Sequence, residues 1–143
     1  MGLSKSRFVS GMQCAKKLYY DVHRKDLRPL VSASKQALFD AGHEVGMLAQ
    51  KCFPGGKDAS SIDFKDFTLA LSNTKQWIDE GVSTIYEATF SFGGVLSAPD
   101  ILHHSNGKRI AIEVKSSTEV KEYHYTDAAL QYWVMSNAGY APD

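Results

Sequence analysis

Hydrophobic residues in the first half of the chain recur at the three- and four-residue spacing of an α-helix. This pattern predicts helices over residues 4–24, 34–53 and 63–79. The second helix carries one stripe of Leu38, Gly42, Val45, Ala49 and Cys52, and Glu44 lies at the border of its apolar face. A Pro-Gly-Gly sequence follows this helix, and we therefore expect it to end there.

The pattern changes to alternation of apolar and polar residues from residue 84, which is typical of β-strands. Strands are predicted over residues 84–92, 95–102 and 108–115. A Gly-Gly pair and an Asn-Gly pair separate them and favour tight hairpin turns, so consecutive strands are expected to pair antiparallel. A last helix is predicted over residues 126–138. Helices, a three-stranded antiparallel meander and a final helix make an α+β fold.

Length and composition suit one domain with one core, since the chain has 143 residues, 43% of them hydrophobic and 22% charged. We expect residues 1–30 to form a basic helical arm and residues 31–143 to form the core. The last residues leave no room for a further strand, so the chain is expected to be a fragment of a longer protein. Without a long apolar run or a signal peptide, the protein is expected to be cytoplasmic and away from membranes.

The net charge is zero, yet basic residues are concentrated at the start of the chain. Residues 1–30 carry seven Lys and Arg side chains against two Asp, which gives this arm a net charge of +5. Such an arm suits contacts with phosphate groups, and Arg7, Lys16 and Lys17 are its candidates for binding nucleic acid. A solvated helix face would have the same composition, so both interpretations stay open.

The tripeptide Glu-Val-Lys occurs twice within nine residues. The first copy ends an alternating strand, so Glu113 and Lys115 project from one face while apolar side chains project from the other. The second copy follows a Ser-Ser-Thr loop signal. Glu119 and Lys121 are therefore interpreted as solvated surface residues.

An acid on the neighbouring strand favours the first copy as a site. Asp100, which follows a proline, lies one hairpin before Glu113, and the Asn-Gly turn can bring the two carboxylates together. Two carboxylates on one sheet surface suit a hard divalent ion such as Mg²⁺ or Mn²⁺, and the backbone carbonyl of Val114 can add a ligand. Lys115 would orient or deprotonate a water molecule, or stabilise developing negative charge.

Glu87 is a further acid whose role the sequence leaves open. It shares the polar face of the first predicted strand with Thr89 and Ser91. From that face it would either reach the site as an outer acid or be an exposed strand residue.

Taken together, these motifs resemble those of the PD-(D/E)xK nuclease superfamily. Asp100 after a proline, followed by Glu113-Val114-Lys115 at the end of an apolar strand, is similar to the superfamily signature. Two more stretches are similar to the RecB-like branch, which includes CRISPR-associated and AddB-type exonucleases. They are LSKSRFVSGMQCAKKLYY at residues 3–20 and Gln131 in the segment DAALQYW.

The resemblance implies a restriction-endonuclease-like core, whose final strand this chain lacks, and metal-dependent hydrolysis of phosphodiester bonds. Asp100 and Glu113 would bind Mg²⁺ or Mn²⁺, and the motif lysine would lie beside the attacking water. A helical acid or histidine would complete the metal shell, but Gly46 stands at the matching position. Glu44 is then expected to be the substitute catalytic and metal ligand, with His43 the next choice.

The same resemblance implies partners and excludes one cofactor. Single- or double-stranded DNA would be the substrate, Gln131 would contact it, and a helicase or another nuclease subunit would be an associated protein. Iron–sulfur members use an early cysteine and three cysteines near the C-terminus. Cys14 matches the first, but no later trio is present in this chain, so no iron–sulfur cluster is expected.

Two alternatives to a nuclease stay open. The mismatch at Gly46 and the missing final strand also suit a catalytically inactive nucleic-acid-binding module on a nuclease fold. A structural or interaction domain that carries the motif by accident is the other alternative.

Overall fold

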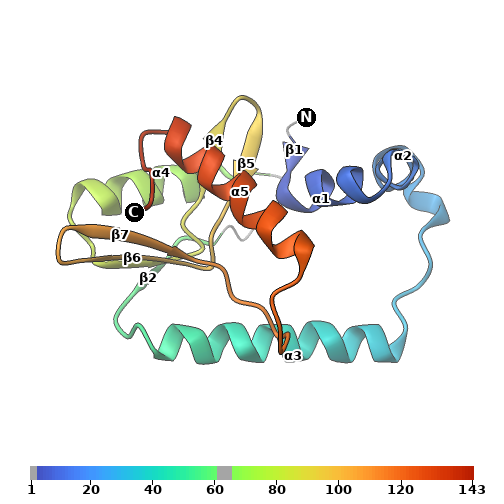
Figure 1. The fold of residues 1–143 in the computed structure, drawn as a ribbon, viewed down its shortest axis with the longest axis horizontal. Coiled ribbons are helices and arrows are strands. Elements are labelled where there is room, and N and C mark those ends of the chain that lie inside the picture. The colour runs from blue at the N-terminus through green and yellow to red at the C-terminus, as the bar shows by residue number, and fades with distance from the viewer. Residues whose placement is uncertain (1–2, 61–65) are drawn as a thin grey trace.

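The computed structural model describes residues 3–60 and 66–143 and has the α+β architecture expected from the sequence (Figure 1). One sheet has the order β1 (Leu3–Ser4), β5 (Val95–Ser97), β4 (Phe90–Phe92). The other has the order β2 (Lys57–Asp58), β3 (Thr84–Tyr86), β6 (Ile101–Ser105), β7 (Lys108–Ile112). The helices are α1 (Lys5–Gln13), α2 (Ala15–His23), α3 (Ala33–Lys51), α4 (Thr68–Asp79) and α5 (Glu122–Asn137), with a 3₁₀ turn at Lys25–Leu27.

The single three-stranded meander is replaced by these two sheets, because the first two predicted strands each break in the middle. The first breaks at Glu87, whose backbone is left-handed with φ of 52°. The second breaks just before β6, where Pro99 has no N–H for a strand ladder. β4 and β5 then form their own hairpin, while β6 pairs antiparallel with both β3 and β7.

The predicted helices are present with different boundaries. The helix expected over residues 4–24 is divided into α1 and α2 by Cys14, whose backbone is extended (φ −167°, ψ 117°). α3 matches its prediction within two residues, and Ser32 caps it by accepting a hydrogen bond from the Lys35 backbone at 3.3 Å. The expected start of the third helix at Asp63 lies outside the described residues. α5 begins at Glu122, four residues before the predicted start.

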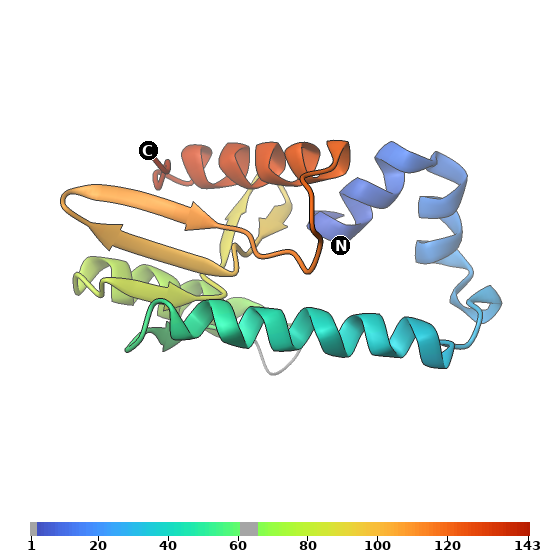
Figure 2. The same cartoon turned by 60° about the horizontal axis from the view of Figure 1, so that its bottom comes forward.

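The core lies between α5 and the sheet of β4 and β5. Its buried members from these elements include Phe90, Val95, Leu130, Val134 and Met135. Burial of such side chains contributes on the order of 1.5–3 kcal/mol each to the free energy of unfolding. Figure 2 shows α5 on one side of the β6–β7 hairpin and α3 on the other.

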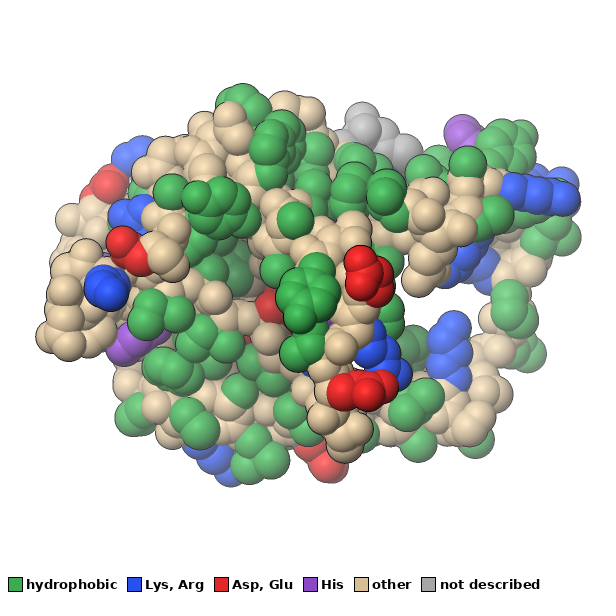
Figure 3. Space-filling model, in the orientation of Figure 1, with side chains coloured by type: hydrophobic (Ala, Val, Ile, Leu, Met, Phe, Trp, Pro, Cys, Tyr) green, Lys and Arg blue, Asp and Glu red, His purple; other side chains and the backbone are tan. Residues whose placement is uncertain are grey.

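The helix predicted here is present as α3, but its apolar stripe is not buried. None of its residues is buried, and Leu38 is 70% exposed. Figure 3 shows open space between α3 and the arm formed by α1 and α2, with Lys and Arg side chains at its rim. The spacing of apolar residues shows which face of a helix is apolar. It does not show whether another part of the chain packs against that face.

Gly56 offers a test of how tightly the loop after α3 packs on the sheet. A methyl group at Gly56 would overlap the Tyr86 ring, with Cε1 at 2.7 Å. The Tyr86 hydroxyl donates to the Phe53 carbonyl at 2.6 Å, so the ring is not free to move away. We expect Gly56→Ala to lower the free energy of unfolding by about 1–3 kcal/mol in urea denaturation.

Gly46→Ala is the matched control, since no atom of the described residues lies within 4 Å of its added methyl group. Alanine in place of this helical glycine should raise stability by up to about 1 kcal/mol. Equal changes in the free energy of unfolding for Gly56→Ala and Gly46→Ala would contradict the packing of Gly56 against Tyr86.

Candidate functional site

Asp100 and Glu113 flank the paired ends of β6 and β7. Ile101 pairs with Ile112, so the two acids are the next residues beyond this pair on adjacent segments. The backbone N–H of Val114 donates to Oδ2 of Asp100 at 2.5 Å and ties the segments together. The structure therefore brings together the two acids that the hairpin pattern predicts to be neighbours.

Glu87 lies beside Asp100 and joins the same acidic cluster. Its backbone N–H donates to the backbone carbonyl of Asp100 at 3.0 Å. A left-handed backbone costs a non-glycine residue about 1–2 kcal/mol. Local contacts offset that cost, among them a 3.0 Å hydrogen bond from Oγ1 of Thr89 to the Glu87 carbonyl. Glu87 is half-buried, so the structure places it as an outer acid of the cluster rather than as an exposed strand residue.

Three carboxylates in one half-buried place oppose each other's ionisation. Burial, then repulsion by Asp100, raises the pKa of Glu87 to about 7. Burial, then repulsion by Glu113, raises the pKa of Asp100 as well. Burial also acts to raise the pKa of Glu113, but attraction to Lys5 and hydrogen bonds from Lys5 and Lys115 outweigh it and hold that pKa below its usual value. A cation bound among these acids would relieve the repulsion.

Two ammonium groups converge on Glu113. Nζ of Lys5 lies 2.6 Å from Oε1 of Glu113, and Nζ of Lys115 contacts the same oxygen. A second acid joins them, since Oδ2 of Asp127 lies 3.1 Å from Nζ of Lys115 and 3.7 Å from Nζ of Lys5. The four groups form a network in which two positive charges balance two negative ones.

Lys5 and Asp127 were not among the site residues predicted from the sequence. Asp127 precedes Gln131 by four residues, so an acid and an amide share one face of a helix, and this spacing is a usable signal. Lys5 has no such signal, because its place depends on the parallel pairing of β1 with β5.

Gln131 orients Glu113 from α5. Its Nε2 donates to Oε2 of Glu113 at 2.7 Å, and its Oε1 accepts from Oγ of Ser97 at 3.5 Å. Gln131 is 3% exposed, so in this structure it is a support for Glu113. Its contact with DNA stays a prediction.

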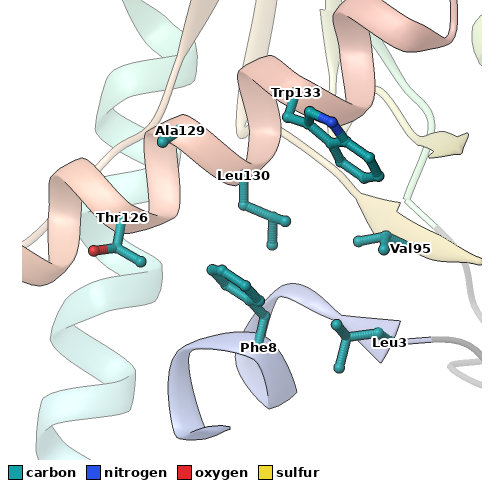
Figure 4. Close-up of a pocket in the computed structure, with 7 residues that line it drawn as sticks. All are labelled: Leu3, Phe8, Val95, Thr126, Ala129, Leu130 and Trp133. Atoms are coloured by element: carbon teal, nitrogen blue, oxygen red, sulfur yellow. The ribbon is translucent and has the colours of Figure 1, made fainter. Parts of the chain in front are cut away.

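The neighbouring face of α5 borders an apolar cavity (Figure 4). Leu130 and Trp133 of α5, Phe8 of α1 and Val95 of β5 point into this cavity of about 540 Å³. α5 therefore packs apolar side chains on one face while it presents Asp127 and Gln131 to the acidic cluster on another. This packing fixes the position from which those two side chains reach Glu113 and Lys115.

Glu44 is not brought to the cluster by the contacts of the described residues. Glu44 is exposed on α3, as is His43. At Gly46, the position that matches the helical ligand, no atom of residues 3–60 or 66–143 lies within 4 Å of an added Cβ. The role of Glu44 as a catalytic and metal ligand stays a prediction.

The candidate phosphate-binding residues lie on the arm. Arg7 belongs to α1, and Lys16 and Lys17 belong to α2. Lys17 donates to Oε1 of Gln13 at 2.9 Å, and Nζ of Lys16 lies 5.9 Å from the ring centre of Tyr20. Both lysines are exposed and thus accessible to a large polyanion.

The donor atoms of the acidic cluster fit a hard divalent cation. Carboxylate oxygens such as those of Asp100 and Glu113 are the ligands that Mg²⁺ and Mn²⁺ prefer. In the part of the chain that the structure describes, no three Asp, Glu, His or Cys side chains are already arranged to hold a metal ion. The ammonium of Lys5 also contacts an oxygen of Glu113 that a cation would need. The carbonyl of Val114 as a further ligand stays a prediction.

No protein-family model, curated protein or solved structure matches this chain. Within the described ranges, no helix combines the length and the apolar character that crossing a membrane requires. A function for the protein therefore has to be inferred from the site itself.

Replacing Glu87 by glutamine should stabilise the protein at pH 8 but not at pH 4. The pKa of Glu87 is about 7 in the folded state against an ordinary 4.5. The folded state thus binds more protons than the unfolded state in this window, and stability falls as the pH rises from about 4.5 to about 7. We expect Glu87→Gln to raise the free energy of unfolding at pH 8 by on the order of 1–2 kcal/mol, a range reduced because Glu87 is partly exposed to solvent.

Urea denaturation in a chelator, repeated from pH 4 to pH 8, measures this gain. Glu119→Gln on the exposed loop is the control and should show no such pH dependence. The same stability difference at both ends of the pH range would contradict the buried, repelled state of Glu87.

Proposed function

We propose that this protein is a Mg²⁺- or Mn²⁺-dependent nuclease that hydrolyses phosphodiester bonds in DNA. The observation that carries the proposal is the convergence of Asp100 and Glu113 with Lys115 at the end of one hairpin. Mutual repulsion in this cluster favours a divalent cation, and the cluster lies on the same protein as an exposed basic arm. Acids, a lysine and a phosphate-binding surface are the parts that such a hydrolysis needs.

Asp100, Glu113 and Lys115 each have a role in this reaction. Asp100 and Glu113 would hold the cation, with Val114 and Gln131 fixing their orientations. When bound, the cation would offset the charge of the phosphate and lower the pKa of a water molecule. Burial acts to lower the pKa of Lys115, but hydrogen bonds to Glu113 and Asp127 outweigh it and raise that pKa above its usual value. Lys115 therefore acts as a cationic donor to the water or to a phosphate oxygen.

The β6–β7 hairpin with its two acids, followed by α5 with Gln131, also supports the finer assignment of the fold. We propose a restriction-endonuclease-like core of the RecB-like branch of the PD-(D/E)xK superfamily. The protein would act in the cytoplasm on single- or double-stranded DNA, together with a helicase or another nuclease subunit.

A catalytically inactive DNA-binding module is the second candidate function. Gly46 favours it, because glycine has no side chain to serve as the helical metal ligand expected at this position. Such a module would bind DNA in the presence of a chelator and would cleave it with no divalent cation.

We expect cleavage of DNA to require a divalent cation and the first Glu-Val-Lys copy, but not the second. Labelled single- and double-stranded DNA should be cut with Mn²⁺, and Asp100→Asn, Glu113→Gln and Lys115→Met should each reduce the rate by about 100-fold or more. Loss of a ligand or of the cationic donor leaves the phosphate charge uncompensated. Gel assays on folded variants provide the measurement.

The second copy supplies the matched controls. Glu119→Gln and Lys121→Met change the same residue types on exposed positions and should leave the rate within about twofold, as expected for solvated surface charges. Absence of cleavage by a folded parent with either cation, together with DNA binding in a chelator, would favour the inactive module. Equal losses from both copies would contradict the assignment of the site.

The second prediction concerns the arm. Lys16→Gln combined with Lys17→Gln should weaken DNA binding in a chelator and reduce the slope of log affinity against log salt by about 1–2, since each phosphate contact releases roughly one counterion. Fluorescence anisotropy at several salt concentrations measures this slope. Lys108→Gln, at an exposed lysine that begins β7, is the control. A slope that the arm substitutions leave unchanged would assign the phosphate contacts elsewhere.

A further inference from the structure

Asp127 is a buried acid that the proposed reaction leaves without a role. Its side chain is 8% exposed, and Oδ2 faces the ammonium groups of Lys115 and Lys5. Its other oxygen, Oδ1, is buried and has no hydrogen-bond partner among the described atoms. A buried carboxylate with an unpaired oxygen is costly, and such an atom calls for an explanation.

A cation at Glu113 would meet two ammonium groups already in place. Lys5 and Lys115 both contact Oε1 of Glu113, and Gln131 holds Oε2. A divalent cation and two ammonium groups on one carboxylate repel each other at close range. Binding of the cation therefore requires that the ammonium groups leave Glu113 for another acceptor.

We propose that Asp127 is the positioning residue that takes over the ammonium groups of Lys115 and Lys5 when a divalent cation binds Glu113. This inference rests on the proposed function, since it needs a cation at Asp100 and Glu113. The transfer is short, because Oδ2 of Asp127 already lies 3.1 Å from Lys115 and 3.7 Å from Lys5. Oδ1 is the acceptor that can complete the second pairing.

The transfer keeps both lysines beside the reacting phosphate. Asp127 and Gln131 are four residues apart on α5, so the helix that orients Glu113 also holds the alternative acceptor. Lys5 then becomes a second cationic donor, brought to the site by the pairing of β1 with β5. Without Asp127, both ammonium groups would stay on Glu113 and compete with the cation.

A double-mutant cycle on Mn²⁺ affinity tests the proposal without any cleavage step. Titration calorimetry would compare the parent, Asp127→Asn, Lys5→Met and the double variant. We expect Asp127→Asn to weaken Mn²⁺ binding by about tenfold and Lys5→Met to strengthen it several-fold. In the Lys5→Met background, the loss of Mn²⁺ affinity caused by Asp127→Asn should be smaller by about threefold or more, because the Lys5 ammonium no longer competes for Glu113.

A spectroscopic measurement separates positioning from a merely structural role. In ¹⁵N-lysine NMR spectra with Mg²⁺, the ammonium signal of Lys115 should remain ordered in the parent and be lost in Asp127→Asn. Asp79→Asn, an exposed acid paired with Lys75 on α4, is the control and should change neither the affinity nor the signal. If Asp127→Asn fails to fold by circular dichroism, Lys5→Met alone decides, since unchanged or weaker Mn²⁺ binding overturns the proposal.

The remaining outcomes separate this inference from the proposed function. The parent could bind Mn²⁺ while Asp127→Asn and Lys5→Met have strictly additive effects on the free energy of binding. That result overturns the role of Asp127 and leaves the nuclease proposal standing. Such additivity would mean that Asp127 acts as a direct ligand or by its charge alone. Absence of Mn²⁺ binding by the folded parent overturns both proposals together.

Discussion

The antiparallel pairing of β6 with β7 is the constraint on which the rest of the site depends. Backbone hydrogen bonds of this ladder set Ile101 opposite Ile112 and so hold Asp100 next to Glu113. Left to themselves, two half-buried acids would separate, since each raises the cost of ionising the other. The ladder and the Val114 hydrogen bond oppose that separation, and the turn at Glu87, the helix α5 and Lys5 are then arranged around it.

α5 connects the apolar core to the charged cluster. Leu130, Val134 and Met135 are buried in the core, and the same helix carries Asp127 and Gln131 toward Glu113. The free energy gained by apolar burial holds polar groups where their own desolvation would disfavour them. A substitution in the apolar face of α5 would therefore act on the site through the helix position and not through any direct contact.

The parts of the site that were predictable from sequence depend on local signals. Alternation and the Asn-Gly turn placed Asp100 beside Glu113, because a strand period and a turn type are properties of a few residues. The breaks at Glu87 and Cys14 were not predicted. No glycine or proline marks either position, and the hydrogen bond from the Glu87 backbone to Asp100 depends on a segment further along the chain. The presence of Lys5 at the site was not predicted for a related reason. Its position follows from the pairing of β1 with a strand about ninety residues away, which no local pattern encodes.

The pairing of β1 with β5 makes the beginning of this sequence part of its chemistry. Lys5 follows β1 directly, so any fusion partner attached ahead of Leu3 bears on the strand that delivers an ammonium group to Glu113. The other end of the sequence is tied elsewhere, since Asp143 accepts a 2.6 Å hydrogen bond from the backbone of Arg109 near the far end of β7. For anyone preparing the protein, the end chosen for an affinity tag is therefore an experimental variable of the site and not a neutral handle.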